Sequence, residues 1–427
     1  MLQIGDKKLI NGWAFYDWAN SVYSLVISTA VFPLYYSGIT SDKVVSFLGI
    51  EWEQPDTLYS YTLSFSFLVV ACMSPILSAI ADYTGNKKRF LKIFCTIGAV
   101  SVMSLYFFES IDTIWIGIVF TFFASIGFWS SVVFYNSYLP EVAHPEDQDR
   151  VSAKGFVYGY AGSVILLVIN LIMILYHDLF GITEAYASRV SFVMVGLWWI
   201  GFAQITFKVL PNNTFHKKPE KDYIWKGFKE LQIVWTEIKT LPTLKGFLIA
   251  FFLLSIGVQT IILLATIFGS SELGLGAISL IVTVVLIQVV AILGATIFSR
   301  ISDKFGNFTA LKITIAIWII VCFCAFLLHK ELPNFYGLGG LLGLVLGAIQ
   351  SLTRSTYSKL LPKTEDHATF FSFYDVTEKI AIVLGTFVYG FLYSLTGPMQ
   401  WSVLSLALFF VASFIVLSRL KNTEFVH

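Results

Sequence analysis

Apolar segments of about 20 residues recur along this 427-residue chain, from about residue 12 to residue 420. A helix needs about 20 mainly apolar residues to cross the hydrocarbon core of a bilayer. With glycine, proline and charge clusters taken as boundaries, the sequence predicts twelve membrane-spanning helices. The first six are expected at 12–37, 57–81, 89–108, 113–139, 152–176 and 187–210, and the second six at 244–269, 274–299, 308–329, 335–360, 370–396 and 399–420.

The composition agrees with an all-α integral membrane protein. Hydrophobic residues make up 56% of the chain and charged residues only 13%, whereas soluble domains are about 25% charged. A soluble protein with so few charges is unable to cover its surface. The first apolar run follows Lys7 and Lys8, but it is too long and too polar for a signal peptide. We therefore expect it to be a retained first helix in a lipid bilayer.

The basic residues predict the orientation of the chain. If both termini are cytoplasmic, the predicted outer loops contain only Lys43, Arg189 and Lys330 among the Lys and Arg residues. The inner loops and inner helix ends contain nearly all the others, including Lys87 and Lys88. Basic residues accumulate on the cytoplasmic side of membrane proteins. The sequence therefore predicts a multi-pass protein of the cell inner (cytoplasmic) membrane with both termini in the cytoplasm.

The longest polar stretch, 211–243, divides the chain into an N-terminal six-helix half (1–210) and a C-terminal six-helix half (244–427). Between Lys221 and Thr240, apolar residues recur at steps of three and four. This periodicity predicts an amphipathic helix that lies in the inner membrane interface. We favour a structural strap between the halves, and a partner-binding helix is the alternative.

The two halves contain related segments in the same order. Residues 80–86 resemble 301–307 at an offset of 221, 135–140 resemble 357–362 at an offset of 222, and 14–22 align loosely with 250–258. Duplicated six-helix halves are typical of transporters, in which a central site lies between the repeats and the halves rock between states. The repeat therefore predicts transport by alternating access.

The segment 78–88, which contains Ala81-Asp82-Tyr83-Thr84-Gly85, is similar to the loop signature of the major facilitator superfamily. Three further segments resemble the vacuole-effluxer-like subfamily: 13–21, 134–141 with 150–152, and 350–355 with 371–375. The resemblance implies twelve helices in two pseudo-symmetric six-helix bundles, with helices 3, 6, 9 and 12 outside. Because fungal members of this subfamily export amino acids from vacuoles, it also implies an amino acid or a similar solute.

The chain departs from many relatives in helix 7. Where those relatives have Asn-Asp-Gly, this chain has Ser255-Ile256-Gly257. If that acid couples ions in the relatives, coupling in this chain must depend on another residue.

Away from the helix ends, the charged residues in the predicted helices are Asp17, Arg354, Asp375, Glu378 and Lys379. An ionisable residue at the bilayer centre costs about 2.5–3.5 kcal/mol, so it normally faces a cavity or a partner. Asp375 and Lys379 are spaced to pair at i, i+4, which leaves Glu378 for Arg354 or for a proton. The alternative is a buried ion network that closes the cytoplasmic gate or fixes helix packing.

Polar and aromatic residues on other helices complete the candidate substrate-binding or coupling set. They are Asn20 beside Asp17, Trp129 and Asn136 on helix 4, Gln259 on helix 7, and Gln350 beside Arg354 on helix 10. Arg354 is suited to bind a carboxylate, although its position near the inner end also favours contact with interfacial water. For Asp17 and the amides, hydrogen bonding between helices is the alternative.

Two corresponding loops contain a predicted conformational switch, made of Asp82 and Gly85 in the first half and Asp303 and Gly306 in the second. We expect these residues to form hydrogen bonds that break when the halves rock. They are not expected to bind substrate.

These features favour a secondary active transporter of a small polar solute, with a proton gradient as the simplest driving force. No G-x-x-x-x-G-K-[ST] segment occurs, which excludes ATP hydrolysis of that kind. Without H-E-x-x-H or G-x-S-x-G, an enzyme is not expected. We expect no cofactor, metal or nucleic-acid partner, and a monomer. Sugars, peptides, other metabolites, or a transport-fold sensor without net flux remain alternatives.

Overall fold

The computed structural model describes residues 2–41, 43–212, 223–271, 273–327, 332–396 and 399–420. Over these residues, twelve helices are long and apolar enough to span a membrane, which confirms the predicted number. The first half contains α1 (Lys7–Val22), η1 (Tyr23–Val31), α2 (Phe32–Thr40), α3 (Pro55–Thr84), α4 (Lys87–Ser104), α5 (Ile114–Asn136), α7 (Gln148–Leu175) and α8 (Glu184–Val209). The second half contains α10 (Pro242–Ser271), α11 (Ala277–Phe305), α12 (Asn307–Phe326), α13 (Leu332–Leu360), α14 (His367–Thr396) and α15 (Met399–Ser418).

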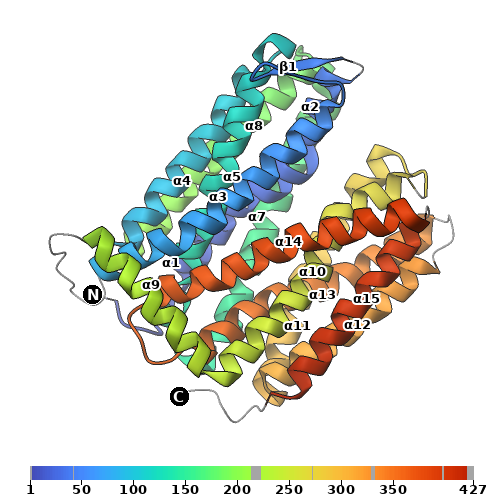
Figure 1. The fold of residues 1–427 in the computed structure, drawn as a ribbon. Helices are drawn as coiled ribbons and strands as arrows, with labels where there is room; N and C mark the ends of the chain where they lie inside the picture. Colours follow the sequence, from blue (N-terminus) through green and yellow to red (C-terminus); the bar gives the residue numbers. More distant parts are fainter. Residues whose placement is uncertain are drawn as a thin grey trace.

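The two halves form separate bundles that meet at one end. Figure 1 shows the blue-to-green first half and the yellow-to-red second half leaning together where α9 lies and diverging toward the opposite ends. We call these the linker end and the far end. Contacts between the halves involve α3, α5 and α7 on one side and α11, α13 and α14 on the other. In contrast, α4, α8, α12 and α15 pack mainly within their own halves, as the resemblance implies.

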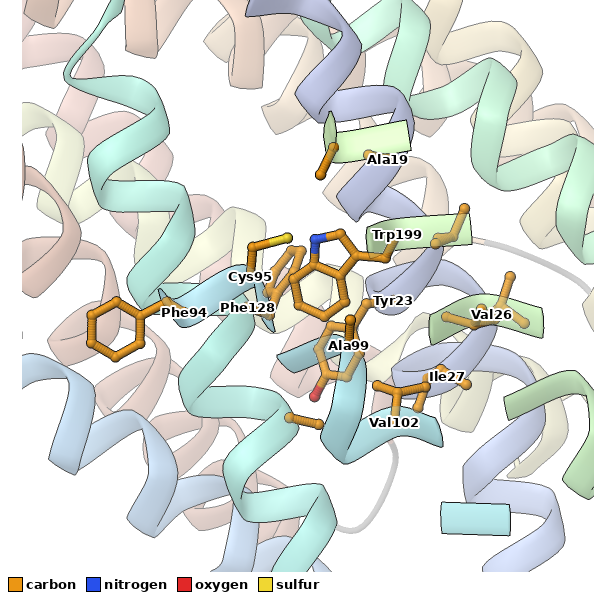
Figure 2. Close-up of a cluster of buried hydrophobic side chains, with 14 of the residues drawn as sticks. Ala19, Tyr23, Val26, Ile27, Phe94, Cys95, Ala99, Val102, Phe128 and Trp199 are labelled. Carbon is orange, nitrogen blue, oxygen red and sulfur yellow. The ribbon is translucent and has the colours of Figure 1, made fainter. Parts of the chain in front are cut away.

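Close packing of small and aromatic residues holds the first half together. Figure 2 shows Trp199 of α8 between Tyr23, Phe128 and residues of α4. The rings of Tyr23 and Phe128 have centroids 4.9 Å apart. A Cβ on Gly98 of α4 would lie 2.3 Å from the Trp199 ring, so only glycine leaves room for it. Aromatic and small residues thus fix the bundle in an environment where hydrophobic burial gives little driving force between helices.

The first membrane span has an irregular middle that the sequence analysis did not anticipate. We predicted one helix at 12–37, but Tyr23–Val31 is a π-helix between two α-helices. The Thr29 hydroxyl donates to the Ser24 carbonyl oxygen at 2.9 Å, across five residues. Segments of π-helix often occur at functional sites. The hairpin of β1 (Val45–Phe47) and β2 (Ile50–Trp52) at the far end was also not predicted.

The linker contains α9 (Tyr223–Thr240), close to the predicted helix at 221–240. Residues 213–222 of the linker, and Lys330, lie outside the described residues. The ring of Trp235 stacks on that of Phe373 in α14 at 5.4 Å, and the Lys226 ammonium lies 5.6 Å from the ring centroid of Tyr83 in α3. Because α9 contacts both halves, its position fits the strap interpretation.

The smaller elements are η2 (Leu105–Phe107), η3 (Ile111–Thr113), α6 (Leu139–Val142), η4 (Pro145–Asp147) and η5 (His177–Phe180). They lie at the ends of membrane spans or between them. Of these, α6 matters for the site, because it presents an acidic residue to the second half at the linker end.

Candidate functional site

A cavity of about 320 Å³ lies between the two halves. Its walls come from α1, η1, α3, α5 and α7 of the first half and α10, α11, α13 and α14 of the second. The cavity is lined by most of the predicted substrate-binding or coupling residues: Asp17, Asn20, Trp129, Asn136, Gln259, Gln350, Arg354 and Glu378. The other two, Asp375 and Lys379, are buried and are not among the lining residues.

Arg354 joins the two halves at the linker end of the cavity. Its Nη1 donates to Asp17 Oδ2 at 3.2 Å and to Asn136 Oδ1 at 3.1 Å. Its Nε and Nη2 donate to the hydroxyl and carbonyl oxygens of Ser152 at 3.0 and 2.8 Å. The guanidinium also lies 4.1 Å from the ring centroid of Phe156. We call this set of contacts the Arg354 cluster, and it closes the cavity toward the linker end.

The Arg354 cluster differs from the expected pairing. The sequence analysis offered Glu378, or the carboxylate of a substrate, as partners of Arg354. In the structure, Asp17 is its acidic partner, and the Arg354 side chain is only 3% exposed. The sequence analysis did not identify Ser152 and Phe156 as site residues. Ser152 belongs to the segment 150–152 that carries the family resemblance, whereas Phe156 is an ordinary residue on an apolar helix.

Asp17 also accepts a hydrogen bond from a residue of its own half. The Tyr135 hydroxyl donates to Asp17 Oδ2 at 2.8 Å, and the Trp13 indole donates to the Tyr135 carbonyl oxygen at 3.0 Å. The Trp13 and Tyr135 rings stack with centroids 4.6 Å apart. Both aromatic residues belong to the segments that carry the family resemblance, so the motif was informative although their role was not predicted.

We expect Gly155→Ala to disturb the Arg354 cluster. A Cβ at position 155 would lie 2.5 Å from Asp17 Oδ2 and 2.9 Å from Arg354 Nη2. Overpacking of this kind destabilises a protein by about 1–3 kcal/mol, so the melting temperature of the purified protein should fall. Thermal unfolding of the two purified variants checks this. Gly201→Ala is the matched control because nothing lies within 4 Å of its Cβ position; equal melting temperatures for both variants would contradict the prediction.

A second charged group lies on α14. Lys379 Nζ is 2.9 Å from Asp375 Oδ1, which confirms that this i, i+4 pair forms in the structure. The same ammonium is 3.6 Å from Glu378 Oε2 and 3.5 Å from the centroid of the Trp129 ring, which belongs to the first half. The Gln259 amide donates to Glu378 Oε1 at 2.6 Å. Glu378 thus contacts Gln259 and Lys379, and the predicted pairing with Arg354 is not present.

Gln350 provides a further contact between the halves. Its Oε1 accepts a hydrogen bond of 2.5 Å from the Tyr160 hydroxyl on α7. Tyr160 was not predicted as a site residue, but it also lines the cavity. Asn20 lines the cavity from α1 and is almost fully buried.

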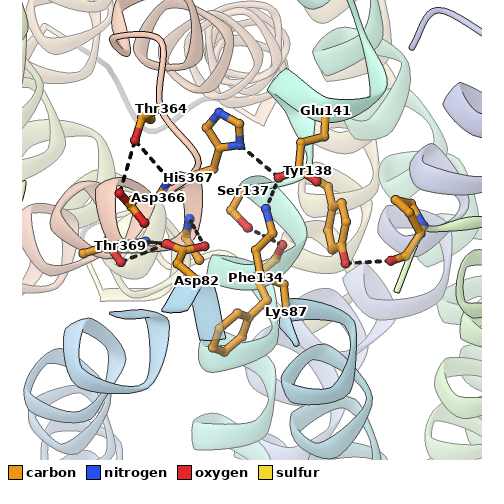
Figure 3. A network of polar contacts seen from close by, with 12 residues as sticks. Asp82, Lys87, Phe134, Ser137, Tyr138, Glu141, Thr364, Asp366, His367 and Thr369 are labelled. Carbon is orange, nitrogen blue, oxygen red and sulfur yellow. Dashed lines mark hydrogen bonds and ion pairs between the residues drawn. The ribbon is translucent and has the colours of Figure 1, made fainter. Parts of the chain in front are cut away.

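The predicted switch residue Asp82 binds the first turn of α14 in the opposite half. Its carboxylate accepts hydrogen bonds from the backbone N–H groups of Ala368 and Thr369 at 3.2 and 2.7 Å, and from the Thr369 hydroxyl at 2.8 Å (Figure 3). A helix N-terminus stabilises a negative charge in this position. Gly85 ends α3 with φ +67°, a conformation that glycine adopts easily.

The corresponding residue Asp303 also contacts the opposite half, through the side chain of Arg150 instead of backbone N–H groups. Its Oδ2 accepts a hydrogen bond of 2.7 Å from Arg150 in the first turn of α7. Gly306 follows it with φ +85°. Each of the two aspartates therefore reaches the start of the fifth helix in the opposite half, as expected of a duplicated architecture.

Glu141 on α6 lies beside the Asp82 contact. It forms an ion pair with Lys87, and its Oε1 is 2.9 Å from Nδ1 of His367 at the start of α14 (Figure 3). Burial alone raises the pKa of a carboxyl group, but the Lys87 ammonium and His367 outweigh it and lower the pKa of Glu141 to about 2. Glu141 is therefore ionised at neutral pH and adds a second acidic contact to the start of α14.

We expect Asp82→Asn to loosen the linker end. The loss of a charged helix cap costs about 1 kcal/mol, which corresponds to about a fivefold shift in population. A cysteine at buried Ser351, in a background without the four native cysteines, reports this shift. Its labelling by an aqueous maleimide should become about fivefold faster. Asp112→Asn, an exposed change, is the control; equal labelling in both variants would exclude Asp82 from the switch.

Comparisons with known proteins agree with this architecture. The family model described as "Vacuole effluxer Atg22 like" matches residues 5–424. The chain is 34% identical over 411 residues to the uncharacterized MFS-type transporter YxiO of Bacillus subtilis (strain 168), covering 96% of this chain and 94% of that one. It is 26% identical over 465 residues to autophagy-related protein 22 of Kluyveromyces lactis, covering 95% and 92%.

Solved structures show the same fold. The major facilitator transporter FucP in the outward conformation superposes with a TM-score of 0.71 at 14% identity, covering 97% of this chain and 98% of that one. The proton:xylose symporter XylE superposes with a TM-score of 0.72 at 11% identity, covering 96% and 94%. At these identities the likeness concerns the fold alone.

Proposed function

The chain belongs to the vacuole effluxer Atg22-like family of major facilitator transporters, and on this premise we propose that it moves a small polar solute by alternating access, driven by a proton gradient. The observation that carries this proposal is the Arg354 cluster. It joins the two halves at the linker end of a polar cavity, through hydrogen bonds that separate when the halves rock apart. Residues 1–210 and 244–427 are the rocking units, and 211–243 is the strap.

The linker end is the cytoplasmic end in this proposal, and the membrane is the cytoplasmic membrane. The support is the concentration of Lys and Arg at the linker-end helix termini and loops. Both termini are then cytoplasmic, and the cavity in this structure is closed toward the cytoplasm. Asp82 with Gly85, and Asp303 with Gly306, act as the switch, because each aspartate holds the first turn of a helix in the opposite half.

An amino acid or a similar small solute is the favoured substrate. The support comes from relatives named autophagy-related protein 22 and from the mixed lining of the cavity. Asn20, Asn136, Gln259 and Gln350 offer hydrogen bonds, while Trp129 offers an aromatic surface. The proton carrier is Glu378, a cavity-lining carboxylate that shares the Lys379 ammonium with Asp375. The transporter acts as a monomer, since each chain contains both rocking halves.

A thermal-shift screen of the purified chain against amino acids, sugars, nucleosides and peptides tests the substrate class. A ligand that binds only the folded protein stabilises it by about 2.7 kcal/mol at 100 times its Kd. We expect amino acids to raise the melting temperature. A response to sugars alone would exclude the amino-acid proposal, and a stabilising ligand that is not carried into proteoliposomes would indicate a sensor without net flux.

A further inference from the structure

The charges around the cavity do not balance. Asp17, Arg354 and Glu378 line it, and Asp375 and Lys379 lie behind Glu378. Three carboxylates thus face two cations, which leaves one negative charge in excess. An isolated carboxylate in a low-dielectric interior is strongly unfavourable, so a positive charge has to compensate it.

The excess charge lies at Glu378. Asp17 is paired with Arg354 at 3.2 Å. The Lys379 ammonium is 2.9 Å from Asp375 but 3.6 Å from Glu378, so it compensates Asp375 first. Gln259 donates one neutral hydrogen bond to Glu378, which orients its carboxylate without balancing the charge.

Of the two carboxylates on α14, Glu378 is the one that lines the cavity. Its side chain is 19% exposed, compared with 6% for Asp375 and 1% for Lys379. Trp129 lines the cavity and lies 3.5 Å from the same ammonium. A carboxylate beside an aromatic ring is a favourable environment for an ammonium group. The ammonium of Lys379 already contacts both Glu378 and the Trp129 ring.

No other charged group competes for Glu378 among the described residues. The facing residue on α10 is the neutral Gln259. The Arg354 guanidinium on α13 is engaged by Asp17, Asn136 and Ser152. Neither α5 nor α15 contains an acidic or basic residue. Asp82 of α3 and Glu237 of α9 lie at the linker end of α14. At a rise of 1.5 Å per residue, that end is about 15 Å from Glu378.

We propose that Glu378 binds a proton when the cavity is empty and the ammonium group of the substrate when it is loaded, so that the transporter exchanges one proton for one substrate molecule. This inference rests on the proposed transport function. The substrate enters as an ammonium ion that already carries its proton, and Glu378 releases its own proton to water. No bond other than the O–H bond of Glu378 breaks. Coupling is then antiport, because both ligands cannot occupy Glu378 together.

Proton release on binding tests the exchange directly. The probes are L-leucine, its methyl ester, which has the ammonium group alone, 4-methylpentanoate, which has the carboxylate alone, and L-fucose. They are added to the purified full chain in weakly buffered solution with a pH indicator. We expect leucine and the ester to bind and to release about one proton each. We expect no binding by the other two. Binding of the ammonium probes without proton release would overturn the exchange, and so would binding of only the carboxylate or the sugar.

Two variants on α14 locate the proton. In competition with one proton, the Kd of the ester rises about tenfold per pH unit as Glu378 becomes protonated. In Glu378→Gln the ester should bind weakly at every pH, without this dependence, whereas Asp375→Asn should keep both the binding and its pH dependence. Because Asp375 Oδ2 is buried without a hydrogen-bond partner among the described residues, it is the rival proton site. The opposite result for the two variants would assign the proton to Asp375 and overturn the proposal.

The direction of the pH gradient that drives uptake tests the exchange mechanism separately from the transport function. In proteoliposomes with the membrane potential held at zero, an acidic interior should drive uptake of L-leucine, up to about tenfold accumulation per pH unit for a one-to-one exchange. Accumulation under an acidic exterior would mean symport, so the exchange would fail while the transport function stands. The absence of flux in either direction for every solute of the screen would instead contradict the transport function.

Discussion

Arg354→Ala is expected to abolish transport and to destabilise the protein by about 3–5 kcal/mol, as found when one partner of a buried ion pair is removed. The Arg354 side chain is 3% exposed, and its loss leaves the Asp17 carboxylate buried without its cation. The Ser152 carbonyl and the Asn136 amide oxygen lose a donor at the same time. Uptake in proteoliposomes and the melting temperature of the purified protein are the two measurements.

A paired variant separates the role of Arg354 in folding from its role in transport. In Arg354→Ala with Asp17→Asn, no unpaired charge remains, so most of the lost stability should return. Transport should remain absent, because the contact that closes the cavity at the linker end is still missing. Recovery of transport in the double variant would show that Arg354 serves packing alone.

Glu378→Gln is expected to reduce accumulation driven by a pH gradient to background, by about 100-fold or more for a two-unit gradient. The amide keeps the shape of the side chain and can still bond Gln259, which now contacts Glu378 at 2.6 Å. It cannot carry a proton between the two faces of the membrane. We therefore expect the free energy of unfolding to change by no more than about 1 kcal/mol, so the melting temperature should stay nearly the same.

Asp375→Asn is the matched control for Glu378→Gln, because the two carboxylates share the Lys379 ammonium. We expect this control to retain gradient-driven accumulation, although at a reduced rate, since Lys379 loses its nearest acidic partner. Accumulation at the normal level in Glu378→Gln would remove this residue from the mechanism. Loss in Asp375→Asn alone would transfer its role to Asp375.

Much of the fold could be predicted because the bilayer imposes a strong local rule. A spanning helix has to be about 20 residues long and mainly apolar, so all twelve spans were visible as runs of sequence. The periodicity of 221–240 predicted α9 for the same reason. The π-helix at Tyr23–Val31 and the hairpin at β1 and β2 were missed, because neither changes the apolar pattern that marks a span.

Most of the predicted site residues line the cavity, but their contacts were only partly predicted. The charges are costly in lipid, so their presence on α1, α13 and α14 was enough to indicate a shared interior. The pair of Asp375 and Lys379 followed from helix geometry within one segment. By contrast, the partner of Arg354 was a choice between residues on different helices, and no local pattern distinguishes Asp17 from Glu378.

The sequence by itself determined that this chain spans a membrane twelve times, that its halves are related, and that a few charged side chains lie inside. These follow from length, hydropathy and spacing, which are properties of neighbouring residues. Only the tertiary structure decided that Arg354 binds Asp17, 337 positions away, and that Trp129 lies on Lys379 across the two halves. The physical reason is that an ion pair acts over a few ångströms, and the distance between two helices is set by the packing of all the residues between them.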